Sequence, residues 1–285
     1  MKGNNSKSIG VLYGDQAENG LTHDFFAAIL EGFRKAIETR GYNMCFFNTN
    51  KEYPEAKSFL DQAKEEGYAG VFIPCIDFMN SEVVELMKSG MPVATIDSDV
   101  EGVVSVNSDN KGGMTELMEY LISMNHKRIA FITGEECDVT RIRLSAFINS
   151  MKKANINVKG EYIKQGKYRN INMATYLTEE LMRLPEPPSC IIYPDDYAAI
   201  GGLNVLRARG FEIPSEMSIA GFDGIDIMSQ YEPRITTVFQ DKDGLGKVAA
   251  SELMEWIENP DYKPGEPIIV ETQFKKGRSV GKVYY

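Results

Sequence analysis

The chain has 285 residues, of which 43% are hydrophobic and 25% are charged, a composition typical of folded globular proteins. This length exceeds what one small core requires and suits two lobes of ordinary domain size. The 31 basic and 41 acidic residues leave a net charge of −10, and an acidic chain repels phosphate backbones. This segment is therefore expected to bind nucleic acid poorly by itself.

The sequence shows no signal for export, membrane insertion or metal binding. The opening stretch MKGNNSKSIGVLYG has no apolar signal-peptide core, and no apolar run approaches the ~20 residues of a membrane span. The four cysteines form no CxxC pair, so neither a zinc site nor a redox motif is expected. We expect a cytoplasmic protein without metal, cofactor or membrane partner, and we interpret residues 1–6 as a linker remnant.

Apolar strands alternate with amphipathic helices along the chain. The first half predicts strands at 8–13, 43–47, 70–74, 92–96 and 103–106, and helices at 25–39, 55–66 and 81–88. The second half predicts helices at 111–124, 141–154, 173–183, 196–209 and 245–258, and strands at 128–132, 161–164, 189–193, 218–222, 235–239, 268–270 and 273–275. Crossover helices between strands imply parallel sheets that helices cover on both faces. The fold class is therefore α/β, with two Rossmann-like lobes.

Polar residues gather where the predicted strands end. Ligands of parallel sheets bind at the carboxyl ends of the strands, so the two lobes should present these residues to a common cleft. The residues in such positions are Asp97, Asp195, Asp196, Asp223, Gln240 and Asp241, with Asp24, Phe25 and Phe26 after the first strand and Arg141 and Arg143 opening a later helix.

This set of side chains suits a polyol. A carboxylate accepts hydrogen bonds from two neighbouring hydroxyls, an arginine donates to oxygens, and an aromatic ring covers the apolar face of a sugar. An aspartate after a strand equally suits a helix N-cap, and both roles stay open for each one. Asp109 and Asp241, which each open a helix, are predicted to be caps alone.

Signals for catalysis are weak. The only histidines are His23 and His126, and His126 precedes a buried strand, which favours a structural hydrogen-bonding role. The sequence has no GxSxG nucleophile elbow and no GxxxxGK[ST] phosphate loop, and Gly201 and Gly202 lie inside a predicted helix. Paired carboxylates could support glycoside chemistry, so an enzyme acting on a sugar stays open as a rival.

Several stretches together resemble the effector-binding module of the lactose-repressor family, whose fold is that of periplasmic sugar-binding proteins. They include HDFFAAILEGFRKAIETRGY, PVATID and TRIRLSAF. The most specific are PDDYAAIGGLNVLRARGFEIPSEMSIAGFDG and EPRITTVFQDKDGLGKVAASELMEWIENP. The resemblance runs from about residue 7 to 275. It implies a protein that binds a small effector, by expectation a sugar, and that is not an enzyme.

The resemblance also implies three hinge crossings, near 106–109, 238–240 and 263–267. The N-terminal lobe then comprises 7–107 plus 240–265, and the C-terminal lobe comprises 108–239 plus 266–285. A ligand that contacts both lobes would favour a closed form.

The ligand contacts of the family are carried over one position at a time. The arginine that holds the ligand matches Arg143 in RIRL, and the aspartate of the GFD motif matches Asp223. The remaining matches are Asp97 after PVATI, Asp195 where asparagine is common, Tyr197 two residues later, Phe25 and Phe26 in the first loop, and Gln240 in VFQD.

Three positions depart from the family pattern. Asp24 stands where proline is common, after a first loop that is longer than usual in the family. Asp195 adds an acidic acceptor, which would favour a ligand with more donors or with a positive group. Lys242 replaces an aromatic residue that stacks on the ligand in some members.

The resemblance implies further partners and leaves rivals. DNA would be bound only through a segment that this chain lacks, and the module would form a homodimer. The family also binds purines and nucleosides, which the predicted aromatics could stack against. A solute-binding protein of a sugar transporter shares the fold but needs export, for which the sequence shows no signal.

Overall fold

The structure, a computed structural model, describes residues 7–14, 20–50, 56–226 and 231–284. The chain forms two compact units. Unit 1 contains Met1–Ser108 and Asp241–Val270, and unit 2 contains Asp109–Gln240 and Glu271–Tyr285. The chain leaves unit 1 for the last time after Val270, five residues later than the sequence predicts. The reason is that the strand at 268–270 pairs with a strand of unit 1.

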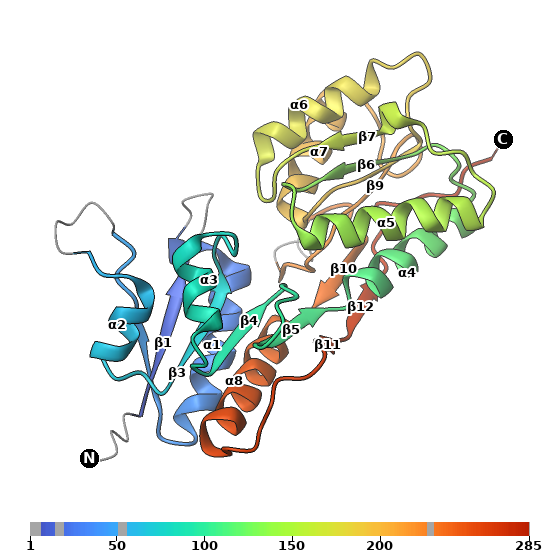
Figure 1. The fold of residues 1–285 in the computed structure, drawn as a ribbon. Helices are drawn as coiled ribbons and strands as arrows, with labels where there is room; N and C mark the ends of the chain where they lie inside the picture. The colour runs from blue at the N-terminus through green and yellow to red at the C-terminus, as the bar shows by residue number, and fades with distance from the viewer. Residues whose placement is uncertain (1–6, 15–19, 51–55, 227–230, 285) are drawn as a thin grey trace. The chain divides into compact units, whose positions relative to one another are not determined.

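Unit 1 is built on a parallel sheet with the strand order β11-β5-β4-β3-β1-β2. Its strands are β1 (Ser8–Tyr13), β2 (Asn43–Phe46), β3 (Gly70–Cys75), β4 (Val93–Ile96), β5 (Val104–Ser108) and β11 (Ile268–Val270). Its helices are α1 (Asp24–Glu38), α2 (Phe59–Glu65), α3 (Ser81–Lys88) and α8 (Lys242–Glu258), with a 3-10 turn, η1, at Gly20–Thr22. The ribbon in Figure 1 shows these elements by label.

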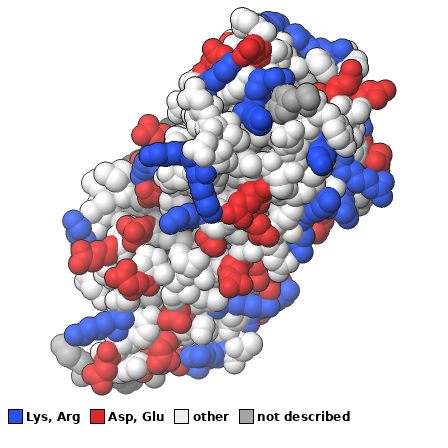
Figure 2. Space-filling model, turned by 90° about the vertical axis from the view of Figure 1, so that its right-hand side faces the viewer, with Lys and Arg blue, Asp and Glu red and all other residues white. Residues whose placement is uncertain are grey.

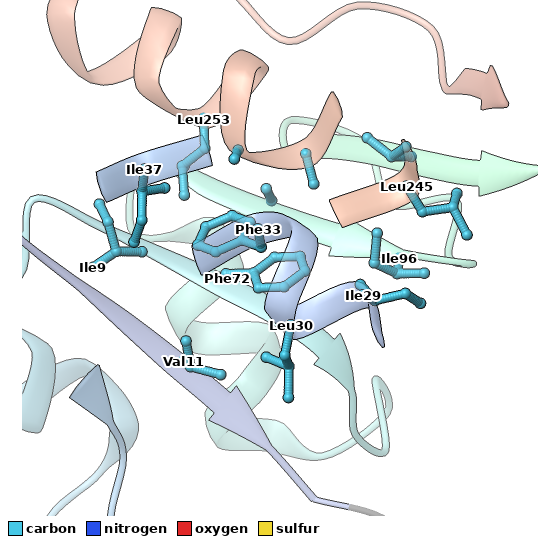
Figure 3. Close-up of a cluster of buried hydrophobic side chains, with 14 of the residues drawn as sticks. Ile9, Val11, Ile29, Leu30, Phe33, Ile37, Phe72, Ile96, Leu245 and Leu253 are labelled. Carbon is cyan, nitrogen blue, oxygen red and sulfur yellow. The ribbon is translucent and has the colours of Figure 1, made fainter. Parts of the chain in front are cut away.

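Alternate residues of the strands bury opposite faces of this sheet, because successive strand residues point to opposite sides. Phe72 of β3 packs under α1 and α8, where its ring stacks on Phe33 with centroids 3.9 Å apart (Figure 3). Its neighbours Val71 and Ile73 belong to the second core, which lies under α2 and α3. Both faces of the sheet are therefore covered, as the apolar strands predict.

Helices α1 and α8 approach each other through glycines. A Cβ atom placed on Gly246 would lie 2.0 Å from the carbonyl oxygen of Ile29 and 2.7 Å from the amide nitrogen of Phe33. In the same contact, a Cβ atom on Gly32 would lie 2.5 Å from the carbonyl oxygen of Asp243. The two helix backbones are thus in direct contact, and only glycine fits at both positions.

Gly246→Ala tests this contact. Alanine is the better helix former by about 0.8–1 kcal/mol, so propensity alone predicts a gain in stability. We instead expect the free energy of unfolding to fall by about 1–3 kcal/mol, because the added methyl group overpacks a backbone contact. Urea denaturation followed by circular dichroism measures the change. Gly265→Ala is the matched control, since a Cβ there meets nothing within 4 Å. Equal stability of the two variants would contradict the close helix contact.

Unit 2 has a four-stranded parallel sheet and a separate antiparallel pair. The parallel order is β7-β6-β8-β9, and β10 pairs with β12. The strands are β6 (Ile129–Thr133), β7 (Ile163–Gln165), β8 (Cys190–Ile192), β9 (Ser218–Ala220), β10 (Thr237–Gln240) and β12 (Thr272–Lys275). The helices are α4 (Asn110–Ser123), α5 (Asp138–Lys153), α6 (Ile171–Met182) and α7 (Asp196–Ala208), with a 3-10 turn, η2, at Gly160–Tyr162.

The sheet of unit 2 is also covered on both faces. Phe131 and Ile192 pack with α4 and α5, whereas Ile132 and Ile191 pack with α6 and α7. Figure 1 shows these two helix pairs on opposite sides of β6. The α/β fold class with parallel sheets is therefore confirmed. No helix in the part of the chain that the structure describes is long and apolar enough to cross a membrane.

Three predicted helix starts were wrong by three residues or more. Helix α8 begins at Lys242 and not at 245, directly after its N-cap Asp241. Helix α5 begins at Asp138 and not at Arg141, because Cys137 is extended and its carbonyl already accepts the N–H of Arg141. Helix α2 begins at Phe59, after the N-cap Ser58, whose side chain accepts the N–H of Asp61. The predicted start at 55 lies outside the described residues.

His126 has the structural role that the sequence predicts. Its Nδ1 lies 2.9 Å from Ser189 Oγ, and its Nε2 lies 3.0 Å from the carbonyl oxygen of Gly281. Since a carbonyl only accepts, Nε2 carries the hydrogen and donates it. Burial lowers the pKa of His126 to about 4. The ring is therefore neutral at physiological pH, and it fastens the C-terminal segment to the start of β8.

This lowered pKa predicts a pH dependence of stability. The unfolded chain binds a proton at the ordinary histidine pKa near 6.5, whereas the folded chain binds it only near 4. The contribution is therefore fully present above about pH 6.5 and is lost as the pH falls toward 4. We expect His126→Gln to flatten the fall in the free energy of unfolding between pH 6.5 and 4.5, measured by urea titration. Parallel curves for the two proteins would contradict this role.

Candidate functional site

The predicted site residues form two groups, one in each unit. Unit 1 holds Asp24, Phe25, Phe26 and Asp97, and unit 2 holds Arg143, Asp195, Tyr197, Asp223 and Gln240. Most of these residues follow the carboxyl ends of strands or lie in the first turn of the next helix. Arg143 lies in the second turn of α5, and Gln240 is the last residue of β10.

The group in unit 1 centres on an aromatic cluster. The rings of Phe25 and Phe26 meet edge to face, 5.2 Å apart, and Phe26 also contacts the rings of Tyr13 and His23 at 5.8 and 4.7 Å. The Tyr13 hydroxyl donates to the carbonyl oxygen of Gly20 at 2.9 Å, which ties the first loop to β1. Phe25 is buried and Phe26 is half-buried, so Phe26 is the ring more open to a ligand.

Two aspartates and a lysine complete this group. Asp97 follows β4 with a left-handed backbone (φ 50°), and its Oδ1 accepts the N–H of Ser108 at 3.2 Å. It therefore also joins the ends of β4 and β5. Asp24 is the first residue of α1. The Nζ atom of Lys242, which opens α8, lies 6.0 Å from the Phe25 ring centroid, so this departure from the family pattern places a cation beside the aromatics.

The cation of the unit 2 group is Arg143. It is buried, with 3% of its surface exposed. Its Nε donates to Asn110 Oδ1 at 2.8 Å, and its Nη1 donates to the carbonyl oxygen of Pro194 at 3.0 Å. The guanidinium carbon lies 3.6 Å from the Phe222 ring centroid. All these partners are neutral, and the described residues provide no carboxylate in ion-pair contact with Arg143.

Asp195 is fully buried and acts as a double acceptor. Its Oδ1 accepts the N–H of Ala198, which makes it the N-cap of α7, and its Oδ2 accepts the N–H of Arg169 at 2.6 Å. Burial, and then the nearby Asp223 carboxylate, raise the pKa of Asp195 above its ordinary value. Of the two roles that the sequence leaves open, the structure shows the capping role. Asp109 and Asp241 are likewise N-caps, of α4 and α8, as predicted.

Asp223 and Gln240 are bonded to each other. Gln240 Nε2 donates to Asp223 Oδ1 at 2.7 Å, and both side chains are buried. Asp223 has a left-handed backbone (φ 91°), a conformation that costs free energy in a non-glycine residue and is often found at functional sites. Asp196 lies behind this pair, where its Oδ2 accepts the N–H of Ile225 and burial raises its pKa well above the ordinary value.

The sequence analysis missed a loop of unit 2. Residues 166–170, between β7 and α6, bring Tyr168 and Arg169 to the same strand edge. The Tyr168 ring centroid lies 6.0 Å from the Arg143 guanidinium carbon, and the Arg169 guanidinium carbon lies 4.0 Å from the Tyr197 ring centroid. The strand-end rule would have found these residues had it been applied to the weak strand predicted at 161–164.

A second missed residue is Asn110, which supports Arg143 from the start of α4. Asn110 is a buried polar residue in a helix whose other buried residues are mostly apolar. This contrast was the only sign in the sequence that its side chain has a polar partner. Among the described residues, no group of histidine, cysteine and acidic side chains is arranged to hold a metal ion.

Comparisons with known proteins agree with this fold. The family model of the periplasmic binding protein-like domain matches residues 118–280, more than half of the chain. A probable HTH-type transcriptional repressor, ExuR of Bacillus subtilis, is 27% identical over 98% of this chain and 82% of its own length. The crystal structure of a putative transcriptional regulator LacI from Bacillus cereus subsp. cytotoxis is 26% identical, with a TM-score of 0.88 over 98% of this chain and all of that chain.

A further solved structure shows the same fold. It is a LacI family transcriptional regulator from Enterococcus faecium with bound ribose, 22% identical, with a TM-score of 0.83 over 97% of this chain and all of that chain. The relatives are transcriptional regulators and not enzymes, which confirms the expectation of a non-enzyme. The chain belongs to the periplasmic binding protein-like domain family, and its relatives are LacI-family transcriptional regulators.

Proposed function

We propose that this chain is the sensing module of a transcriptional regulator. It binds a small effector, a sugar, at the strand ends of both units, and the bound effector favours one arrangement of the units over another. A DNA-binding domain outside this chain reads that change. The observation that carries this function is Arg143, a buried guanidinium that lies on the ring of Phe222, the residue before Asp223, which is hydrogen-bonded to Gln240.

A sugar is the ligand that these groups recognise best. Arg143 uses Nε and Nη1 for neutral protein partners, which leaves Nη2 to donate to a ligand oxygen. The carboxylate of Asp223 accepts from hydroxyl groups, and the aromatic cluster of Tyr13 and Phe26 covers apolar carbon. The bound ribose in the Enterococcus faecium structure supports the same class of effector.

We assign the binding of DNA to a separate domain because the net charge of this chain does not suit it. The net charge is −10, and on the face drawn in Figure 2 basic and acidic side chains are interspersed without a continuous basic surface. A phosphate backbone requires such a surface for affinity. We also propose a homodimer, because paired DNA-binding domains convert a change within each protomer into a change of spacing.

A thermal-shift screen tests the proposed effector class first. The purified chain is heated with pentoses, hexoses, disaccharides, sugar phosphates and nucleosides. We expect a selective rise in Tm with sugars, because a ligand that binds only the folded state stabilises it. A rise with nucleosides alone would replace the sugar by a base that stacks on the aromatic cluster.

Asp223→Asn tests the site with the sugar that gives the largest shift. The change removes the charge and half of the acceptor capacity but keeps the shape. We therefore expect at least a tenfold loss of affinity in calorimetry, about 1.4 kcal/mol, with little change in Tm of the free protein. Asp109→Ala is the control, because Asp109 is a cap: it should lower stability by ~1 kcal/mol and leave affinity unchanged. Unchanged affinity of Asp223→Asn would remove Asp223 from the site.

A further inference from the structure

We propose that Asp196 is a positioning residue of the unit 2 site, which fixes the turn at residues 221–225 without contacting the effector. This turn follows β9 and carries Asp223. Asp196 is fully buried, so a ligand at the strand edge does not reach its side chain. The inference rests on the proposed function, because effector affinity is the quantity that the position of this turn sets.

The backbone of the turn needs support from its neighbours. Asp223 and Gly224 are consecutive residues with left-handed backbones, at φ 91° and 62°. Because this conformation is unfavourable for a non-glycine residue, Asp223 keeps it only where surrounding groups impose it. The N–H of Ile225, which follows directly, is buried and therefore needs an acceptor.

Asp196 supplies this acceptor from the first position of α7. Its Oδ2 accepts the N–H of Ile225 at 2.9 Å. Its Oδ1 lies against Gly221, where a Cβ atom would be only 2.1 Å from that oxygen. The carboxyl group therefore contacts both ends of the turn.

Strand β10 holds the turn from the other side. Asp223 forms a β-bridge with Phe239, and a Cβ atom on Gly224 would lie 2.7 Å from the Cα atom of Phe239. The turn is thus packed between β10 and the start of α7. Asp196 is the side chain that supports it from the helix.

The surroundings of Asp196 favour the neutral form of its carboxyl group. Among the described residues its Oδ1 has no hydrogen-bond partner, whereas both oxygens of Asp195 accept N–H groups. Burial raises the pKa of Asp196 well above its ordinary value, and the carboxyl groups of Asp223 and Asp195 act in the same direction. The hydroxyl of Thr237 and the N–H of Ile225 act in the opposite direction without outweighing burial. An uncharged side chain of the same shape should therefore support the turn equally well.

Effector affinity tests the positioning role. Calorimetry compares Asp196→Asn and Asp196→Ala with the wild-type chain, at a temperature where circular dichroism shows each protein to be folded. The probe is whichever of D-ribose, D-glucose, D-galactose and cellobiose the wild-type chain binds most tightly. Asparagine keeps an oxygen for the N–H of Ile225, so we expect its affinity to stay within twofold of wild type. Alanine leaves that N–H buried without an acceptor, and we expect at least a tenfold loss.

Two results would overturn this role. Unchanged affinity of a folded Asp196→Ala protein would show that the turn does not depend on Asp196. A tenfold loss in Asp196→Asn would show that the site needs a charge at this position and not a support, and this result does not require the alanine variant to fold.

The pH dependence of stability tests the neutral form without any ligand. In the unfolded chain Asp196 ionises near its ordinary pKa of 3.8, whereas in the folded chain it keeps its proton to a higher pH. The wild-type protein therefore loses stability as the pH rises through this interval, and asparagine has no such proton to lose. We expect the Tm of Asp196→Asn minus that of wild type to increase from pH 4.5 to pH 7.5.

Asp138→Asn is the matched control. Asp138 is likewise the first residue of its helix, α5, but its side chain is exposed. Its Tm difference from wild type should not increase over the same pH interval, and its effector affinity should equal that of wild type. A constant Tm difference for Asp196→Asn as well would show that Asp196 is ionised in the folded protein and would overturn its role as a neutral support.

The outcomes separate this inference from the proposed function. If a sugar binds and Asp196→Ala keeps its affinity, only the positioning role is wrong and the sugar-sensing function stands. If none of the four sugars binds the wild-type chain, the sugar-sensing function is wrong and the positioning role falls with it.

Discussion

The packing of α8 against α1 is the contact on which the two-unit organisation depends. The chain leaves unit 1 after Ser108, forms most of unit 2, and returns at Asp241 to supply α8. Without α8, the part of this sheet face that carries Ile96 and Val104, on β4 and β5, would lose its helix cover. The glycine contact lets the helix backbones touch, which brings α8 close enough to bury that face. The core of unit 1 is therefore completed only by a segment that follows residues 109–240 of unit 2. For this reason the chain must pass through unit 2 before unit 1 is complete.

Unit 2 uses glycine in the same way and places polar groups at the end of the packed layers. A Cβ atom on Gly201 of α7 would lie 2.5 Å from the carbonyl oxygen of Ile171, at the start of α6. This close approach brings the starts of α6 and α7 together. The loop before α6 can therefore reach Asp195, the cap of α7. The contact between α6 and α7 therefore positions the loop at 166–170, whose Tyr168 ring lies near Arg143.

Most of the fold could be predicted from the sequence because the apolar pattern sets both the strands and the faces that helices cover. The strands at 8–13 and 268–270 and the helix at 81–88 have the predicted bounds. Helix starts were less predictable, since they depend on which residue accepts the first helical hydrogen bond. At α5 this residue is Cys137, which has no capping side-chain bond to reveal it.

The candidate site could be predicted only in part. The strand-end rule selected predicted residues in both units. It could not separate an aspartate that faces a ligand from one that holds backbone. Tyr168 and Arg169 follow a strand of three residues whose apolar pattern is weak, and for that reason the rule was not applied to the end of this strand. Asn110 is identified by one hydrogen bond to Arg143, and such a partner depends on tertiary structure.

Asp195 shows how a carried-over role changes when the residue type changes. Asparagine, common at this position in the resembling family, would offer one acceptor oxygen and one donor group. Asp195 offers two acceptors, and two backbone N–H groups, from Ala198 and Arg169, use them both. An amide NH2 in place of Oδ2 would face the N–H of Arg169, and two donors repel each other. Both oxygens of this aspartate therefore bind backbone, and the ligand contact that the sequence predicts for it stays a prediction. Asp195 thereby fixes the loop that carries Arg169, from which α6 and β8 separate it along the chain.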